Sequence, residues 1–263
     1  MPPISRISQL VGFMSEQMTG RKESMKSAIA SLRWGAILFC CLFVLLNKAQ
    51  AADVVAHIAV TRQHDSAAAK HMSNGGVVVW LTSDTNSSSQ PAARQHYTLI
   101  QKNKQFNPHI LVIPTGSSVD FPNLDPFFHN VFSLFNGKRF DLGLYEAHTQ
   151  RSVQFDRDGI SYIFCNIHPE MGAVIITLST PYYATSSRDG SVVLHNVPPG
   201  SYRLHVWAEN VPNDRLEALS RDVSAGQQNT DLGVISVETS GDVMNHHKNK
   251  FGESYTPVAK DPY

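Results

Sequence analysis

The most informative residues lie in two short stretches of the chain, Phe164-Cys165-Asn166-Ile167-His168-Pro169-Glu170-Met171 and Phe127-Phe128-His129-Asn130-Val131. Cys165, His168 and Met171 are spaced as Cys-x₂-His-x₂-Met, and His129 lies 36 positions before Cys165. One thiolate, two imidazoles and one thioether form a soft, mixed ligand set, which is typical of a trigonal His₂Cys copper site with a weak axial methionine. These four residues are therefore candidate ligands of a single metal ion.

The residues around Cys165 indicate how such a site would be assembled. A strand that starts at Ile160 would place Cys165 at its end, and a tight turn would bring His168 back to the same point. Pro169 would stiffen the path to Met171 before the next strand leads away. His129 has to arrive from a separate strand, so the site would form only in the folded protein.

The chain after residue 51 has almost no helical periodicity, whereas short runs of Val, Ile, Tyr and Phe recur between Gly, Pro, Asn and Asp. This pattern predicts an all-β protein. In Ser201–Trp207 apolar and polar residues alternate, which predicts that Tyr202, Leu204 and Val206 face a core. The expected strands are Val54–Val60, Gly76–Thr82, His109–Pro114, Ser118–Phe121, Ile160–Cys165, Ala173–Leu178, Gly190–Leu194, Ser201–Trp207 and Leu232–Val237.

The segment Arg188–Tyr202 contains an Asp-Gly turn, a strand, a Pro-Pro-Gly turn and the start of a second strand. It resembles the carboxypeptidase regulatory-like family, whose fold is a transthyretin-like β-sandwich. The resemblance implies an earlier pair of strands, which Val54–Val60 and Gly76–Thr82 would supply. We therefore expect a smaller, discontinuous transthyretin- or Ig-like sandwich from residues 52–95 and 181–240, with residues 96–180 inserted as a separate domain. The polar residues 241–263 are expected to form a flexible tail.

Residues 96–180 resemble the cupredoxins, and the short ligand loop is similar to that of amicyanin. Phe121–Asp125, His129–Ser133 and Phe140–Glu146 look like the exported cupredoxin-type proteins labelled methylamine utilisation proteins. The resemblance implies a Greek-key β-sandwich with one type 1 (blue) copper ion per chain. It implies His129, Cys165 and His168 as equatorial ligands, Met171 as the axial ligand, and the main-chain amide of Asn130 as a donor to the cysteine sulfur.

Several alternatives remain open at the level of the sequence. Glu170 or a backbone carbonyl could take the axial position, and a cupredoxin fold can also exist without a metal. His246-His247 is a weaker metal candidate in the polar tail, and Asn86-Ser87-Ser88 matches a glycosylation acceptor. His109 and His148 have no partner at ligand spacing and are expected to be ordinary exposed residues.

An uncharged apolar run, Trp34–Leu46, follows Lys26 and Arg33 and precedes Ala49-Gln50-Ala51. This pattern predicts that residues 1–51 are a secretory signal peptide, with an alternative start at Met25 and with the periplasm as the destination. A cytoplasmic leader is the alternative. The run has 13 residues, fewer than the roughly 20 that span a bilayer, so no stable membrane span is expected. Cleavage would remove Cys40 and Cys41, which leaves Cys165 without a disulfide partner.

The composition and the candidate ligands argue against nucleic-acid binding and against catalysis at the metal. The formal net charge of the whole chain is zero, which gives no electrostatic reason to expect nucleic acid as a partner. Residues 1–51 hold six basic and two acidic side chains of the 22 of each kind, which leaves 16 basic and 20 acidic, a net charge of −4, in residues 52–263. A closed His₂Cys-Met site leaves no vacant position for a substrate, and the sequence contains no His-x-His pair of the kind that multicopper oxidases use.

We therefore expect a one-electron carrier rather than an enzyme. Its partner would be a redox protein such as a c-type cytochrome or a dehydrogenase. This partner would dock near His168 on an apolar patch formed by Ile167, Pro169, Phe127 and Phe128. Two alternatives belong to other classes: a periplasmic copper-handling protein, and a β-sandwich interaction module with a cupredoxin insert that has no redox role.

Overall fold

The computed structural model describes residues 50–62, 73–83, 94–134, 137–239 and 248–255. Residues 1–49 of the expected signal peptide, the Asn86-Ser87-Ser88 motif and the pair His246-His247 lie outside these ranges. None of the helices formed by the described residues has the length and apolar character needed to cross a membrane.

The expected all-β class is confirmed. Within the described ranges the chain forms β-strands and one short helix, α2, at Asn213–Leu219. The strands are β1 (Ala52–Arg62), β2 (Val78–Ser83), β3 (His96–Thr98), β4 (Ile100–Lys102), β5 (Gln105–Asn107), β6 (Ile110–Pro114), β7 (Ser118–Pro122), β8 (His129–Ser133), β9 (Phe140–Tyr145), β10 (Gln150–Gln154), β11 (Gly159–Phe164), β12 (Gly172–Leu178), β13 (Tyr183–Thr185), β14 (Ser191–Val197), β15 (Gly200–Trp207), β16 (Arg221–Ala225) and β17 (Thr230–Thr239).

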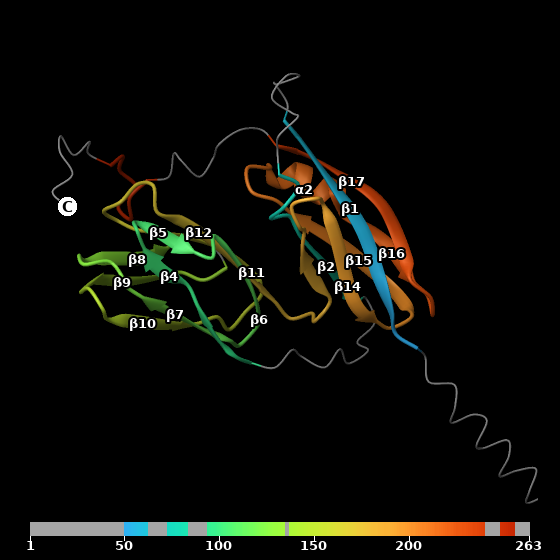
Figure 1. Cartoon of the computed structure of the whole chain (residues 1–263), viewed down its shortest axis with the longest axis horizontal. Helices are drawn as coiled ribbons and strands as arrows, with labels where there is room; N and C mark the ends of the chain where they lie inside the picture. The colour runs from blue at the N-terminus through green and yellow to red at the C-terminus, as the bar shows by residue number, and fades with distance from the viewer. Residues whose placement is uncertain (1–49, 63–72, 84–93, 135–136, 240–247, 256–263) are drawn as a thin grey trace, which may run out of the picture. The chain divides into compact units, whose positions relative to one another are not determined.

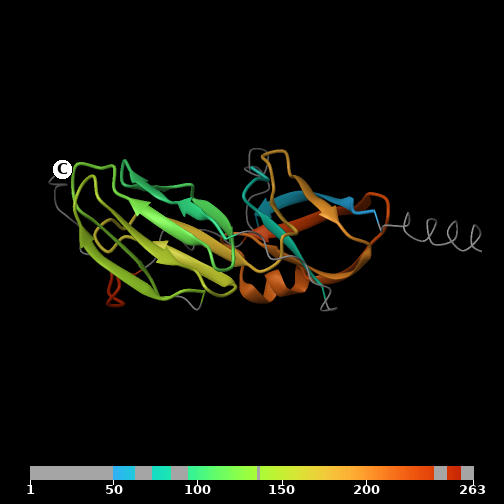
Figure 2. The same ribbon diagram turned by 90° about the horizontal axis from the view of Figure 1, so that it is seen from below.

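Strands β3 to β12 build the sandwich that carries the candidate ligands (green to yellow in Figures 1 and 2). One sheet has the strand order β10-β7-β3 and the other the order β6-β12-β11-β8-β9, with β4 and β5 as a separate two-stranded ribbon. Successive side chains of a strand point to opposite faces of its sheet, so every second side chain points into the space between the two sheets. Phe121 of β7 packs there in one apolar cluster with Ile163 of β11 and Ile175 of β12, and all three are completely buried.

A second pair of sheets has the orders β14-β1-β17 and β13-β2-β15-β16. Strand β1 runs antiparallel to β14, with Val55 opposite Val193, and parallel to β17, with Ile58 opposite Ile235. Strand β2 runs antiparallel to β15, with Leu81 opposite Leu204. Strands that precede residue 96 therefore pair with strands that follow residue 180.

The alternation expected in β15 is also confirmed. Tyr202, Leu204 and Val206 are buried, whereas Arg203 and His205 between them are only partly covered. His205 stacks on Trp80 of the neighbouring strand, with the ring centroids 5.1 Å apart. Burial of every second side chain fixes the register of this strand, because a slip by one residue would turn the apolar set out of the core.

Candidate metal centre

The loop between β11 and β12 carries three of the four candidate ligands. Strand β11 ends at Phe164, directly before Cys165, and β12 begins at Gly172, directly after Met171. Phe164 pairs with Gly172, so the two ends of the loop are held side by side. Inside it the N–H of Cys165 donates to the carbonyl of Met171 at 3.2 Å, and the N–H of Met171 donates to the carbonyl of His168 at 3.1 Å. The loop is therefore closed by its own main chain.

The fourth candidate, His129, is the first residue of β8, a strand that is buried along its whole length. Strand β8 is hydrogen-bonded to β11 through the pair Phe132 and Phe164. This pairing brings the start of β8 to the end of the sandwich where the ligand loop lies. Strand pairing thus brings His129 close to Cys165, although the two residues are far apart in the sequence.

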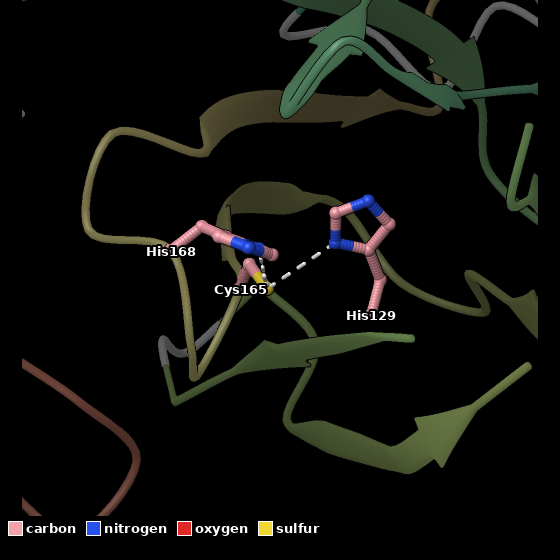
Figure 3. Close-up of side chains that lie close together, drawn as sticks. All are labelled: His129, Cys165 and His168. Carbon is pink, nitrogen blue, oxygen red and sulfur yellow. Dashed lines mark hydrogen bonds between the residues drawn. The ribbon is translucent and has the colours of Figure 1, made fainter. Parts of the chain in front are cut away.

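Figure 3 shows the Cys165 sulfur with a ring nitrogen of each imidazole turned toward it. Nδ1 of His129 lies 3.8 Å from Sγ of Cys165, and Nδ1 of His168 lies 3.6 Å from it. The candidate donor atoms of these three residues all lie within 4.8 Å of one another. Metal–sulfur bonds of about 2.3 Å and metal–nitrogen bonds of about 2.0 Å place the two donor atoms roughly 3.5–3.8 Å apart on a shared ion. Both sulfur–nitrogen separations therefore match those expected on a shared metal ion.

Asp125 determines which nitrogen of His129 is available to a metal. Nε2 of His129 lies 2.8 Å from Oδ2 of Asp125, and both side chains are buried. A carboxylate can only accept, so Nε2 carries the proton and Nδ1 keeps a lone pair directed at the site. Burial lowers the pKa of the imidazole, and the opposing effect of Asp125 does not cancel this shift. His129 is therefore held as the neutral imidazole that a metal requires.

The Asp125 carboxylate is itself fixed by the backbone. It accepts the N–H of Asn103 at 2.6 Å and the N–H of Lys104 at 2.9 Å. Burial acts to raise the pKa of this carboxyl, but the hydrogen bonds from Lys104, His129 and Asn103 outweigh it, so the pKa is lowered. Asp125 is consequently ionised and is held beside the imidazole by two main-chain hydrogen bonds.

Three main-chain amides are directed at the Cys165 sulfur. They are the N–H groups of Asn130, Ile167 and His168. Burial raises the pKa of the thiol, and these three donors oppose that shift. The thiolate is the metal-binding form, so amides that stabilise negative charge on sulfur suit a cysteine ligand. The amide of Asn130, which the cupredoxin resemblance implied as a sulfur donor, is one of the three.

The axial candidates differ in burial. Met171 is completely buried and belongs to the same apolar cluster as Cys165. Glu170, the alternative from the sequence, is exposed. A thioether in an apolar cluster suits a weak, long axial bond. The burial therefore favours Met171 over Glu170 for that position.

Aromatic and aliphatic side chains surround the two imidazoles. The Phe127 ring packs against His129 and His168, with centroid distances of 5.2 and 5.7 Å. His129 and Cys165 have no exposed surface, whereas His168 retains 9%. Three large apolar side chains at this end of the sandwich are exposed: Leu124 by 45%, Phe128 by 50% and Ile167 by 40%. His168 is thus the most exposed of the candidate ligands.

The structure adds residues that the sequence did not reveal. Asp125 lies four positions before His129, and this spacing is the one local signal that could have identified it. The segment 248–255 also reaches the site, although its polar composition gave no sign of such a contact. His109 and His148 are outside the cluster: His109 bonds to Glu209 and to the carbonyl of Gly172, and His148 occupies a turn with φ of 58°.

No protein-family model matches the sequence, and no curated protein does. Among solved structures, a purple cupredoxin from Nitrosopumilus maritimus is similar at 22% identity and a TM-score of 0.29, covering 31% of this chain and 99% of that one. A copper-containing nitrite reductase from Thermus scotoductus SA-01 is 19% identical, with a TM-score of 0.31 and coverage of 46% of this chain and 28% of that one. A reduced amicyanin variant is 16% identical, with a TM-score of 0.30 and coverage of 38% and 98%. These scores carry no argument about function, which therefore rests on the site itself.

Proposed function

We propose that this chain is an exported type 1 copper protein that passes single electrons between redox partners. The observation that carries the proposal is the buried cluster of His129, Cys165 and His168, in which both Nδ1 atoms lie within 3.8 Å of the sulfur. In this proposal the three residues are the equatorial ligands of one copper ion and Met171 is the axial ligand. Copper bound there would supply one-electron redox chemistry.

The surroundings of the cluster favour electron transfer over catalysis. Cys165, His129 and Met171 have no exposed surface, so a substrate has no open route to the ion. The ligand loop is closed by its own hydrogen bonds, and His129 is fixed by Asp125. Ligands held in this way move little when the charge on a bound ion changes, and small reorganisation favours fast electron exchange. The chain's own residues thus supply rigidity and exclusion of water.

His168 is the proposed point of electron entry and exit. It is the equatorial ligand with accessible surface, and the exposed Phe128 and Ile167 lie at the same end of the sandwich. A small apolar patch suits brief docking with a partner, because weak redox encounters bury little surface. A redox protein such as a c-type cytochrome or a dehydrogenase would fit this patch. The net charge of −4 on residues 52–263 favours a partner with a basic surface.

The first test is the visible spectrum of residues 52–263 with Cu(II). We expect an intense thiolate-to-copper absorption, which Cys165→Ala removes because this range contains no other cysteine. His129→Gln should also remove it, whereas the matched control His148→Gln, outside the cluster, should leave it intact. Met171→Leu preserves the buried volume but deletes the thioether, so the colour should remain while the band positions shift.

A protein that folds normally and stays colourless with copper would contradict the proposal. Electrochemistry then separates a carrier from a copper-handling protein. A carrier should give a reversible one-electron wave and should retain Cu(I) in the presence of a chelator. Rapid loss of Cu(I) to the chelator would instead indicate metal delivery.

A further inference from the structure

The segment 248–255 (red in Figure 1) forms a compact turn organised by Asn249. Oδ1 of Asn249 accepts the N–H of Phe251 at 2.9 Å and the N–H of Glu253 at 3.0 Å. The N–H of Asn249 donates to the carbonyl of Glu253 at 2.9 Å, which closes the turn. Gly252 has φ of +81°, a conformation that favours glycine. The segment therefore has a defined shape, with Lys250 inside the turn and Tyr255 two residues after Glu253.

Two residues of this segment are bonded to the ligand loop, the loop between β11 and β12. The main-chain N–H of Lys250 donates to Oδ1 of Asn166 at 2.9 Å. The phenol of Tyr255 donates to the carbonyl of Cys165 at 2.7 Å. The two acceptors belong to the cysteine and to the residue that follows it. Tyr255 is 90 positions from Cys165 and Lys250 is 84 positions from Asn166, so the contact is purely tertiary.

A third connection runs from Lys250 through Asp141 and Asn130 toward the sulfur. Nζ of Lys250 lies 2.7 Å from Oδ2 of Asp141, and Oδ1 of Asp141 accepts the side-chain amide of Asn130 at 2.7 Å. The main-chain N–H of Asn130 is one of the three donors to the Cys165 sulfur. The segment thus bonds directly to the carbonyl of Cys165. Through Asp141 it is also connected to Asn130, whose main-chain amide donates to the Cys165 sulfur.

We propose that residues 248–255 act as a strap over the metal centre, with Lys250 and Tyr255 as positioning residues for Cys165. The strap holds the ligand loop closed and keeps the Asn130 amide aimed at the sulfur. It thereby restricts access of reagents to the thiol and slows the departure of a bound ion. Protection of the thiol does not depend on the proposed copper function, whereas the effect on metal retention rests on it.

The strap lies outside the apolar cores, which makes it testable by substitution. Lys250 retains 26% exposure of its side chain, Tyr255 is partly buried, and Phe251 is exposed by 70%. Neither Lys250 nor Tyr255 belongs to either cluster of buried apolar residues. Replacing them creates no core cavity, so we expect the unfolding midpoint to change little.

The first readout uses metal-free residues 52–263, in which Cys165 is the only cysteine. The rate of reaction with 5,5′-dithiobis(2-nitrobenzoate) measures how often the loop opens. Lys250→Met removes the Nζ contact with Asp141, and Tyr255→Phe removes the hydrogen bond to the Cys165 carbonyl. Each should therefore raise this rate about threefold to tenfold. Lys250→Arg keeps the charge and should restore most of the protection. Lys102→Met and Tyr183→Phe, which change the same residue types elsewhere, should react like the parent.

The second readout uses the copper-loaded protein. We expect both strap variants to lose copper to a chelator several-fold faster and to show altered thiolate-to-copper bands, which a general loss of stability would not produce. Thiol reactivity that stays at the parental rate in both variants and in their combination would overturn the strap. A parent that binds no copper, with variants whose thiol is deprotected, would leave the strap standing and refute the copper function.

Discussion

The carboxylate of Asp125 and the imidazole of His129 form a buried hydrogen bond of 2.8 Å between Oδ2 and Nε2. This bond places the imidazole proton on the side of the ring that faces away from Cys165. The opposite nitrogen, Nδ1, is then free to face the sulfur at 3.8 Å. A carboxylate behind a histidine ligand fixes both the tautomer and the ring orientation and raises the basicity of the ligating nitrogen.

Asp125→Asn is expected to weaken copper binding. The amide preserves the shape of the side chain, but it no longer supplies a full negative charge to Nε2–H of His129. We expect a loss of about 10–100-fold in affinity, the usual effect of removing such a partner. Competition with a chromophoric chelator measures it. Asp156→Asn, at an exposed carboxylate that pairs with Lys138, is the matched control and should bind like the parent. Equal affinities for the two variants would show that Asp125 does not act on the ligand.

His168→Gly should open the site from the solvent side. This imidazole has 9% exposed surface whereas His129 has none. Added imidazole should therefore enter the space left by His168 and restore the visible bands in a concentration-dependent titration. His129→Gly is the control, because its vacated space is sealed from solvent and free imidazole should not rescue it. If added imidazole rescued His129→Gly but not His168→Gly, the assignment of His168 as the solvent-accessible ligand would be wrong.

Gly190→Ala should destabilise the sheets formed by β1, β2 and β13–β17. Gly190 has φ of +95°, and an added Cβ would lie against the carbonyl oxygen of Ile58, closer than van der Waals contact allows. Gly233→Ala provides a control for backbone strain alone, because Gly233 has φ of +72° and nothing within 4 Å of the added atom. We expect Gly190→Ala to cost more than the roughly 1–3 kcal/mol of a strained backbone conformation, and Gly233→Ala to cost no more than that. Urea unfolding of the metal-free protein measures the free energy of unfolding of both variants. Equal losses of stability would contradict the clash at Gly190.

The stabilisation that Asp141 contributes to the strap should depend on pH. Burial acts to raise the pKa of this carboxyl, but hydrogen bonds from Lys250, Gly143 and Asn130 outweigh it and lower the pKa. A lowered pKa in the folded state means that the stabilisation is present above the unfolded pKa of about 3.9 and is lost as the pH falls through the folded value. We expect Asp141→Asn to be less stable than the parent at pH 6–7.

The difference should be below about 1 kcal/mol, since the Asp141 side chain is partly exposed and screened by solvent. It should shrink as the pH falls below about 4. Urea unfolding of the metal-free proteins between pH 3 and pH 7 measures the trend. A difference that grows in acid would contradict this assignment of the charge.

The strands that were predicted from the sequence share one physical property. Val54–Val60 and Ala173–Leu178, for example, are runs of β-branched and aliphatic residues, and they correspond to β1 and β12. Such residues favour a pleated, half-buried surface whatever the neighbouring strand. The pattern was therefore sufficient to locate these strands to within a few residues.

Strand β8 was expected only as a separate strand that carries His129, and the sequence pattern did not locate its bounds. Its sequence, His129–Ser133, contains a histidine, an asparagine and a serine, yet every residue of it is buried. The burial of the His129 ring and of the Asn130 NH₂ group is compensated by hydrogen bonds that they donate to Asp125 and Asp141. The strand is thus specified by tertiary partners, which a local pattern does not contain. Helix α2 was missed, because seven residues give too little periodicity to detect.

The candidate site divides in the same way. Cys165, His168 and Met171 lie within seven positions, so their spacing was visible in the sequence. Asp125 and Tyr255 act through hydrogen bonds that exist only after folding. The sequence therefore revealed the donor atoms, and the structure revealed what orients them.

The pairing of β1 imposes an order of events during synthesis. Val54 is synthesised 176 residues before its partner in β17, Thr230. A nascent chain that has reached residue 180 already contains β3 to β12, whereas β1 and β2 still lack the neighbours they will have in β14 and β15. During that interval two apolar strands have open edges, which are the elements through which chains aggregate. Chaperone protection of these two strands would therefore matter most while residues 181–239 are being translated.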